Sequence, residues 1–342
     1  MNPVVPAVEA QDASEAIRLH RLMTGFLASR ALFSAVELGV FDALGRGECT
    51  AEELGTRVGL AERPARVLLL ALEGEDLVRG SAGRYRNAPV ASRYLVSCSA
   101  DYIGPLGAHQ AAHFDKLTQL TQALRDNEPV RAGSTYSGAY VDARPWARRW
   151  AETTRASSRL MAEDLAARAP LPGRRHLVDL GCASAAYSLA LARANPNLKV
   201  TAVEQPAIAE VAGEYVAEAG LGGQVEVRPG NIFVDAFPEC DVALLSHVIQ
   251  GFERDRARQL IEHVYGWLPE GGELLLHSHV PERATVPFPY LFGLILLVNN
   301  TQGGEAHGEE LTREWLAGAR FRDVRVIEVS PISVLIRATK LG

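Results

Sequence analysis

Residues 174–205 read RRHLVDLGCASAAYSLALARANPNLKVTAVEQ, and this stretch decides the fold. A short apolar run, HLVDLG, passes through small residues into the helical pattern AYSLALARAN, and a second apolar run, KVTAVEQ, follows. Apolar runs that alternate with helical patterns indicate parallel strands joined by helices that cover both faces of a sheet. We therefore expect an open α/β sheet, which binds ligands at the carboxyl ends of its strands.

The same alternation continues to the end of the chain. It predicts strands at residues 224–230, 241–249, 272–280, 321–330 and 333–339, and helices at 207–220, 254–268 and 311–319. Together with the opening stretch, these elements predict a Rossmann-like domain over residues 171–342 with a mostly parallel seven-stranded sheet.

The first third of the chain has a helical pattern. Helices are expected at residues 21–43, 51–59 and 61–73, and Thr50 begins a capping box before the second of them. A small hairpin is expected over residues 80–96. Three helices and a hairpin describe a winged-helix module over residues 1–100, which serves either DNA binding or dimerisation.

A helical pattern also runs through residues 101–170, with expected breaks at Pro105, residues 127–138 and Pro145. We expect this region to bridge the two modules and to form one wall of a substrate pocket. Arg148, Arg149 and Arg155 in it are candidates for binding a substrate carboxylate, since guanidinium groups bind carboxylates in a bidentate manner. The alternative is that they form a solvated helix face.

Composition and charge exclude several classes of protein. The net charge of −6 disfavours nucleic acid as a partner, and therefore favours dimerisation over DNA binding for the first module. The apolar run at residues 290–298 is far shorter than the roughly 20 residues that span a bilayer, so no membrane partner is expected. No signal peptide is recognised, and the four cysteines lack metal-ligand spacing, which indicates reduced thiols in a cytoplasmic protein.

A nucleoside ligand is predicted by two features of the opening stretch. The small-residue loop after Asp179 allows a ligand to approach the backbone, and it leads directly into the start of a helix. Glu204 ends the next strand, where its carboxylate would accept hydrogen bonds from both hydroxyls of a ribose. The alternative is a tight turn and an unrelated glutamate. The chain has no phosphate-binding P-loop motif.

The chain resembles the small-molecule O-methyltransferases of the caffeate and polyketide type over nearly its whole length. The stretch ALFSAVELGVFDAL resembles the dimerisation segment of that family, and VDLGCASA resembles its glycine-rich loop for S-adenosylmethionine (SAM). The stretches PGNIFVDAFPECDVALLSHVIQGFERD, EGGELLLHSHVPE and TQGGEAHGEELTREWLAGARF are similar to three further family motifs. The resemblance implies a homodimeric, SAM-dependent enzyme that acts on a small molecule.

The resemblance also implies which residues bind SAM. The predicted set is Asp179, Gly181, Ala183, Glu204, Gln205, Asn231, Ile232, Phe233, Ser246 and Phe252. Alanine at positions 183 and 185 replaces the usual glycines. If the glycine backbone there has positive φ, each alanine costs roughly 1 kcal/mol.

The catalytic histidine of the family is replaced in this chain. Gln250 stands at the position of the general base, and Ser278 stands at the position of the glutamate that orients it. A carboxamide cannot accept the proton of a hydroxyl substrate, so methylation of sulfur, nitrogen or carbon is as well supported as methylation of oxygen. The same fold could instead support a non-methylating cyclase or lyase that retains SAM, or a regulator that senses a small ligand.

Several histidines are candidates for a relocated base. His247 and His113 are ranked first, and Gln250 is predicted to orient the nucleophile. Lower-ranked candidates are His109, His277, His279 and His307. A cluster of them could ligate a metal, but each histidine alone is more often a hydrogen-bonded structural residue, and we predict no metal.

Overall fold

The computed structural model describes residues 10–130, 143–299 and 303–342. The chain packs into two units, residues 1–111 and 112–342, which are considered separately. Most of the predicted break over residues 127–138 lies outside the described residues.

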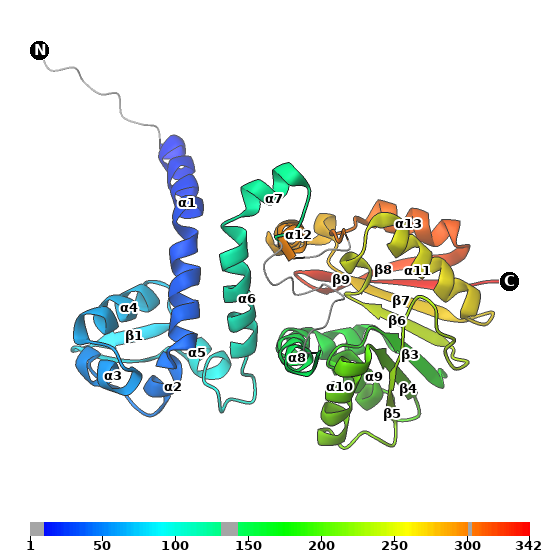
Figure 1. The fold of residues 1–342 in the computed structure, drawn as a ribbon, viewed down its shortest axis with the longest axis horizontal. Helices are drawn as coiled ribbons and strands as arrows, with labels where there is room; N and C mark the ends of the chain where they lie inside the picture. The colour runs from blue at the N-terminus through cyan, green and yellow to red at the C-terminus, as the bar shows by residue number, and fades with distance from the viewer. Residues whose placement is uncertain (1–9, 131–142, 300–302) are drawn as a thin grey trace, which may run out of the picture. The chain divides into compact units, whose positions relative to one another are not determined.

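The first unit contains helices and one hairpin (Figure 1). Its elements are α1 (Ala10–Glu37), α2 (Val40–Gly45), α3 (Ala51–Val58), α4 (Glu62–Gly74), β1 (Val78–Ser81), β2 (Arg84–Asn87) and α5 (Pro89–Tyr94). The single helix predicted over residues 21–43 is wrong, because Gly39 has a φ of 69° and ends α1 before α2 begins. The capping box is confirmed: Thr50 accepts from the Glu53 amide, and the Glu53 carboxylate accepts from the Thr50 amide.

The hairpin predicted over residues 80–96 is only half right. The antiparallel strands β1 and β2 form, but Pro89 then begins α5, because proline is well suited to the first turn of a helix. The core of this unit is formed by the buried side chains of Phe41, Leu54 and Leu69 among others.

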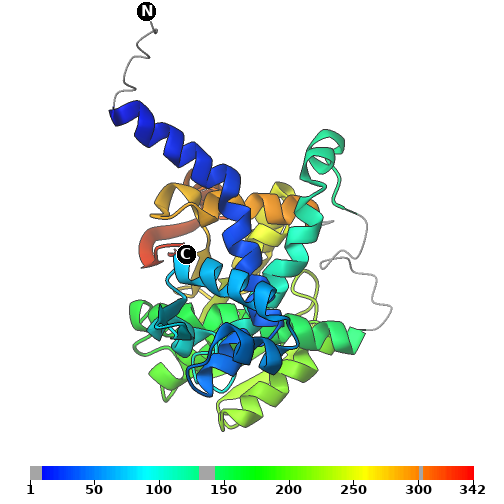
Figure 2. The same cartoon turned by 90° about the vertical axis from the view of Figure 1, so that its left-hand side faces the viewer.

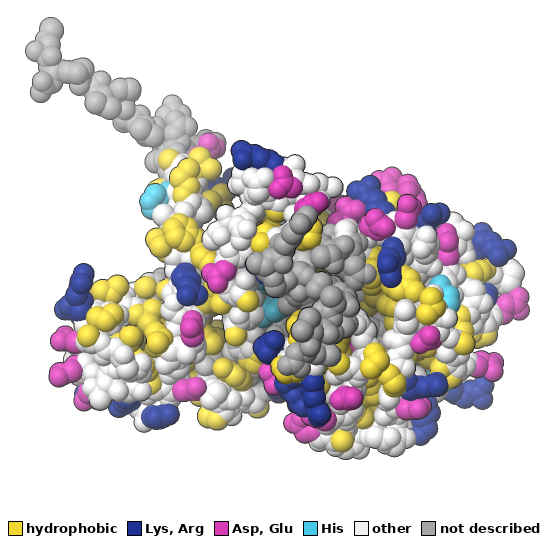
Figure 3. All heavy atoms as spheres, viewed as in Figure 1, with side chains coloured by type: hydrophobic (Ala, Val, Ile, Leu, Met, Phe, Trp, Pro, Cys, Tyr) yellow, Lys and Arg dark blue, Asp and Glu magenta, His cyan; other side chains and the backbone are white. Residues whose placement is uncertain are grey.

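Helix α1 carries apolar side chains that this core does not bury. Ile17, Leu19, Leu22, Met23, Phe26 and Leu27 are each more than half exposed. They form part of the yellow surface along this helix in Figure 3. An apolar stripe of this length on a monomer surface is typical of a protein interface.

In chain order, α5 is followed by α6 (Gly104–Leu117), α7 (Leu120–Asp126) and α8 (Ala143–Arg168), and β3 begins after them. Pro105 and Pro145 do not break helices here. Each lies in the first turn of its helix, where the missing amide hydrogen costs no hydrogen bond.

The second unit is built on a seven-stranded sheet with the strand order β5-β4-β3-β6-β7-β9-β8. The strands are β3 (His176–Leu180), β4 (Lys199–Glu204), β5 (Val225–Pro229), β6 (Val242–Ser246), β7 (Glu273–Ser278), β8 (Phe321–Ser330) and β9 (Ser333–Lys340). Strands β5, β4, β3, β6 and β7 are parallel, and β9 pairs antiparallel with β7 and with β8. The predicted mostly parallel sheet is confirmed.

Alternation along the strands produces two apolar faces. Leu177, Val200 and Leu244 face one side, which is covered by α8, α9 (Ala186–Ala194) and α10 (Pro206–Glu218). Val178 and Val203 face the other side, which is covered by α11 (Arg254–Trp267) and α13 (Glu309–Gly318). Figure 2 shows this unit from a second direction.

The sequence did not predict α12 (Phe288–Asn299), which contains the apolar run at residues 290–298. Apolar side chains occupy most sides of this helix, so its sequence lacks the apolar and polar faces by which an amphipathic helix is predicted. No helix in the described part of the chain is long and apolar enough to cross a membrane.

Candidate functional site

The loop between β3 and α9 keeps a glycine-type backbone although two of its residues are alanine. The φ angles of Gly181, Ala183 and Ala185 are 79°, 49° and 56°. At Gly181 a Cβ atom would lie 2.9 Å from Cγ2 of Val248, so glycine is required there. The positive φ anticipated for the two alanines is therefore present, and the loop retains its path at a conformational cost.

A loop of small residues suggested backbone amides that are free to bind a ligand, but four amides of this loop are bound within the protein. Gly181 and Cys182 donate to the carbonyl oxygen of Val203, Ala185 donates to that of Cys182, and Ala183 donates to Glu204. These donors are already used within the protein, and so are the carbonyl oxygens of Cys182 and Ala185, which accept from Ala185 and Leu189. The loop can offer a ligand only its other carbonyl oxygens. Carbonyl oxygens suit a cationic group.

Glu204 is positioned by backbone amides at the carboxyl end of β4. Its Oε2 accepts from Ala183 at 3.0 Å and its Oε1 accepts from Gln205 at 2.8 Å. Burial raises the pKa of this carboxyl group, and the two backbone hydrogen bonds oppose the rise. Each carboxylate oxygen still has a free lone pair, so Glu204 can accept two hydroxyl hydrogen bonds.

Asp179 is buried next to the loop with one oxygen unsatisfied. Its Oδ2 accepts from the Ser188 hydroxyl at 2.6 Å, whereas Oδ1 has no partner among the described residues. Burial raises the pKa of Asp179 to about 7. An orphaned buried carboxylate oxygen beside carbonyl oxygens fits an ammonium group such as that of the methionine part of SAM.

Aromatic rings lie beyond the end of β5. Phe233 and Phe252 pack edge to face with ring centroids 4.9 Å apart, and the guanidinium group of Arg256 lies 4.4 Å from the centroid of Phe233. Ile232 packs with them. The side-chain oxygen of Asn231 accepts from the amide of Phe233 and so stabilises the turn. Arg256 was missed by the sequence interpretation, although its position one turn after Phe252 was a signal.

Gln250 and Ser278 meet at the carboxyl ends of β6 and β7. Oε1 of Gln250 accepts from the Ser278 hydroxyl at 2.9 Å, and the amide nitrogen of His279 lies 3.5 Å from the same oxygen. Both Gln250 and Ser278 are buried. Gln250 and Ser278 therefore form a hydrogen-bonded pair in which neither side chain titrates.

Three imidazole rings form a cluster beside this pair. The ring centroid of His247 lies 4.4 Å from those of His277 and His279, and the ring centroid of Tyr187 lies 5.2 Å from that of His277 and 6.1 Å from that of His247. His277 connects the hydroxyl of Ser246 at 2.9 Å to that of Ser333 at 3.0 Å. Among the described residues no group of three or more His, Cys, Asp or Glu side chains has the arrangement of a metal site.

The remaining histidines have structural contacts. His113 is buried on α6, and its Nδ1 lies 3.0 Å from the side-chain nitrogen of Asn299 on α12. His307 lies 3.2 Å from the carbonyl oxygens of Ile249 and Phe252, so it stabilises the turn that contains Gln250. The contact of His113 with Asn299 is therefore made on α12, whereas the three-histidine cluster lies at the ends of β6 and β7.

The arginines proposed to bind a substrate carboxylate are paired within the protein. Arg148 donates to Glu214 at 2.6 Å, and Arg155 donates to Glu218 at 2.8 Å, so both stabilise the packing of α8 on α10. Arg149 is exposed. For Arg148 and Arg155 the carboxylate-binding hypothesis is replaced by an intramolecular role.

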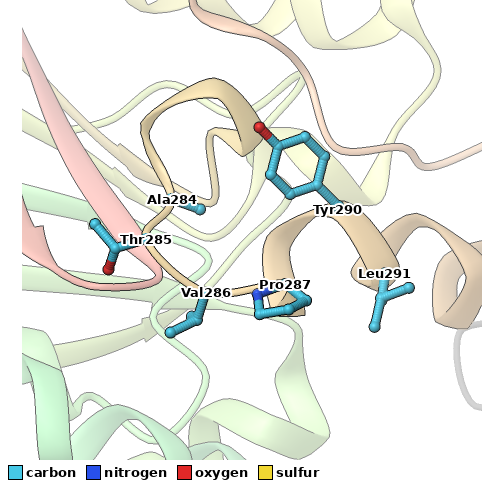
Figure 4. Close-up of a pocket in the computed structure, with 6 residues that line it drawn as sticks. All are labelled: Ala284, Thr285, Val286, Pro287, Tyr290 and Leu291. Carbon is cyan, nitrogen blue, oxygen red and sulfur yellow. The ribbon is translucent and has the colours of Figure 1, made fainter. Parts of the chain in front are cut away.

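One surface hollow lies at the start of α12, and Figure 4 shows its lining of Ala284, Thr285, Val286, Pro287, Tyr290 and Leu291. None of these residues belongs to the predicted SAM site or to the histidine cluster. The hollow therefore does not define the reaction centre.

The fold and the site together define a SAM-binding enzyme of the methyltransferase class. The chain belongs to the O-methyltransferase family, whose methyltransferase domain matches residues 116–322 and whose dimerisation domain matches residues 20–97. It is therefore a SAM-dependent methyltransferase.

Individual relatives differ in the atom named in their reactions. The chain is 32% identical to the N,N-dimethyltransferase OxyT of Streptomyces rimosus, over 83% of this chain and 82% of that protein. It is 30% identical to the 3-hydroxy-5-methyl-1-naphthoate 3-O-methyltransferase of Streptomyces sahachiroi, over 90% and 89% of the two chains. Its fold matches human N-acetylserotonin methyltransferase in complex with SAM, with a TM-score of 0.87, 21% identity and coverage of 99% and 100%.

Proposed function

We propose that this enzyme transfers a methyl group from SAM to an amine nitrogen of a small molecule of specialised metabolism. The observation that carries the proposal is the hydrogen bond between Gln250 and Ser278, two side chains that do not titrate, at the position that the family resemblance assigns to the general base. Phenol oxygen is a weak nucleophile until it loses its proton, whereas a neutral amine already has a reactive lone pair. The similarity to an N,N-dimethyltransferase supports the same acceptor.

The residues present fit SAM. Glu204 would accept from the ribose hydroxyls, and Asp179 with the carbonyl oxygens of the loop from Gly181 to Ala185 would bind the ammonium group. Ile232, Phe233 and Phe252 would enclose the adenine, with Asn231 and Gln205 at its edge and Ser246 beneath the ligand. When bound, SAM supplies an electrophilic methyl group on a positively charged sulfur.

The protein's own contribution is positioning and exclusion of water. Gln250 is held by Ser278, so its amide nitrogen would donate a hydrogen bond that orients the acceptor. Buried surroundings favour the neutral form of an amine, because desolvation lowers an amine pKa. Proximity of this kind contributes much of the rate of a methyl transfer. His113 would line the acceptor pocket from α6.

We also propose a cytoplasmic homodimer with a winged-helix first unit. The exposed apolar stripe of α1 lies in the match to the dimerisation domain and supports the dimer. Three of the four cysteines are buried and all four are free, which supports a reducing compartment.

Tyramine tests the acceptor class, because it carries an alkylamine and a phenol in one molecule. The protein is incubated with methyl-deuterated SAM and tyramine, and mass spectrometry locates the label and quantifies S-adenosylhomocysteine (SAH). Label on nitrogen is the expected result. Label on oxygen, or no labelled product, contradicts the amine proposal. Conversion of a substrate without SAH formation would favour the alternative, a non-methylating catalyst.

A further inference from the structure

One imidazole nitrogen in the site region is available to accept a proton. His277 uses both ring nitrogens, on Ser246 and Ser333. Both ring nitrogens of His247 are shielded from solvent, and the Gln250 side chain interacts with the ring, so His247 is not open to a ligand. His279 differs, because one nitrogen is held by the protein and the other is neither buried away nor hydrogen-bonded within the described residues.

The tautomer of His279 follows from its partner. Nδ1 lies 2.7 Å from the carbonyl oxygen of Ile332, in the turn between β8 and β9. A carbonyl oxygen only accepts, so Nδ1 carries the hydrogen and Nε2 has the lone pair. A backbone carbonyl that fixes the ring in this way orients Nε2 without adding a charge.

His279 also lies next to the hydrogen-bonded pair of Gln250 and Ser278. It follows Ser278 directly, and its backbone amide lies 3.5 Å from the Gln250 oxygen that Ser278 also contacts. These residues are at the carboxyl ends of parallel strands, which is the ligand-binding edge of this sheet type. His279 therefore lies one residue along the chain from Ser278, the position that the resemblance assigns to the orienting glutamate.

The surroundings of His279 keep it neutral. Phe288 and Phe292 of α12 contact the ring edge to face, with centroids 5.3 Å and 5.0 Å away. The titratable groups that face it are His247, from the end of β6, and His277, on β7. Burial lowers the pKa of all three imidazoles below the ordinary value of 6.5. No carboxylate, lysine or arginine of the described residues pairs with the ring.

We propose that His279 is the catalytic base of this enzyme, and that within the proposed amine methylation it selects a primary or secondary alkylamine, whose ammonium form has a proton to lose. The inference rests on the proposed amine methylation and narrows it. An alkylammonium ion has no lone pair, and in water it loses its proton only near pH ~10. A thioether or a tertiary amine carries no such proton and would leave His279 without a role.

The proton and electron movements balance. Nε2 of His279 takes one N–H proton, and the nitrogen lone pair forms the new N–C bond. The C–S bond breaks, and its electron pair stays on sulfur, which becomes the neutral thioether of SAH. The proton on His279 is released to solvent after the product leaves. The aromatic contacts of Phe288 and Phe292 favour its release, because they disfavour the imidazolium form.

The test compares His279→Gln with His263→Gln, which removes a half-buried histidine from α11, outside the site. Single-turnover methylation of tyramine is followed from pH 6.5 to 9. The parent protein and His263→Gln should give nearly constant rates, because His279 is neutral throughout this range. His279→Gln should be slower at pH 7 by about 10²–10⁴-fold and should recover about tenfold per pH unit, since the amine must then deprotonate in solution.

A second measurement needs no acceptor. Nitrogen-15 NMR of the nine histidines, with the signal of His279 assigned by its loss in His279→Gln, should show hydrogen on Nδ1 and titration below pH 6.5. Hydrogen on Nε2, or titration above pH 7, would overturn the assignment even if the variant fails to fold. Calorimetry with SAH should give equal affinity for both variants.

The outcomes separate the two proposals. If the parent protein makes no N-methyltyramine, the amine function fails whatever His279 does. If the parent protein methylates nitrogen and His279→Gln keeps its rate and flat profile, the base assignment fails and the function stands.

Discussion

The buried carboxylate of Asp179 is expected to lower the free energy of unfolding of the ligand-free protein, and Asp179→Asn should remove this loss of stability. The pKa of this carboxyl group rises from 3.8 to about 7 on folding because it is buried. Each pKa unit corresponds to about 1.4 kcal/mol, so the ionised group costs about 4 kcal/mol at pH 7 and above. A raised carboxyl pKa means that the folded state holds a proton that the unfolded state has released. Stability is therefore lost as pH rises from about 4 to about 7.

The stability difference between Asp179→Asn and the parent protein should depend on pH. Asparagine has the same shape, and its oxygen can still accept from Ser188. Asparagine places an N–H group where Oδ1 of Asp179 lies. The free-energy cost of burying this group does not vary with pH, so it cancels when the stability difference at one pH is compared with that at another. The advantage of the variant should grow by about 2–3 kcal/mol between pH 5 and pH 7, and then stay constant to pH 8.5.

Urea unfolding of the ligand-free proteins at several pH values measures this advantage. Asp255→Asn, an exposed substitution on α11, should show no such trend. SAH should reverse the order, because its ammonium group would pair with the ionised Asp179, and Asp179→Asn should bind it at least tenfold more weakly. A stability difference that stays the same at pH 5 and pH 7 would refute the reasoning.

Three further outcomes test the site and the dimer. Glu204→Ala should weaken SAH binding at least tenfold by calorimetry, because it removes charged hydrogen bonds worth about 1.5–3 kcal/mol. Glu210→Ala, which changes an exposed glutamate, should leave the affinity for SAH unchanged. Equal affinities of the Glu204→Ala variant and the parent protein would remove Glu204 from the site. Leu22→Asp should shift sedimentation from dimer to monomer with unchanged helix content, and a parent protein that is monomeric at micromolar concentration would contradict the dimer. Gln250→His should not raise single-turnover methylation, because Ser278 cannot orient an imidazole as a carboxylate would, and a faster variant would show that the position still functions as a base.

The sequence determined the class of fold and the outline of the ligand site. Three local patterns carried this prediction: the alternation of strands and helices, the small-residue loop and Glu204 at the end of a strand. They can be recognised in the sequence because backbone preference and side-chain period act over a few residues. The placement of Gln250 and Ser278 at the dyad positions stays a prediction from the family resemblance, and the structure adds that the two side chains are hydrogen-bonded to each other. The sequence did not predict α12, because its apolar residues do not recur with a helical period.

Tertiary structure decided which side chains meet. His247 and His279 are 32 positions apart, and the parallel pairing of β6 with β7 brings their rings together. The antiparallel pairing of β7 with β9 places the carbonyl oxygen of Ile332 at Nδ1 of His279. The ranking of His247 above His279 came from sequence spacing alone, which carries no information on burial. The pairing of Arg148 with Glu214 is of the same kind. Long-range packing sets solvent access and hydrogen-bond partners, and these determine whether an imidazole or a guanidinium group remains available for chemistry.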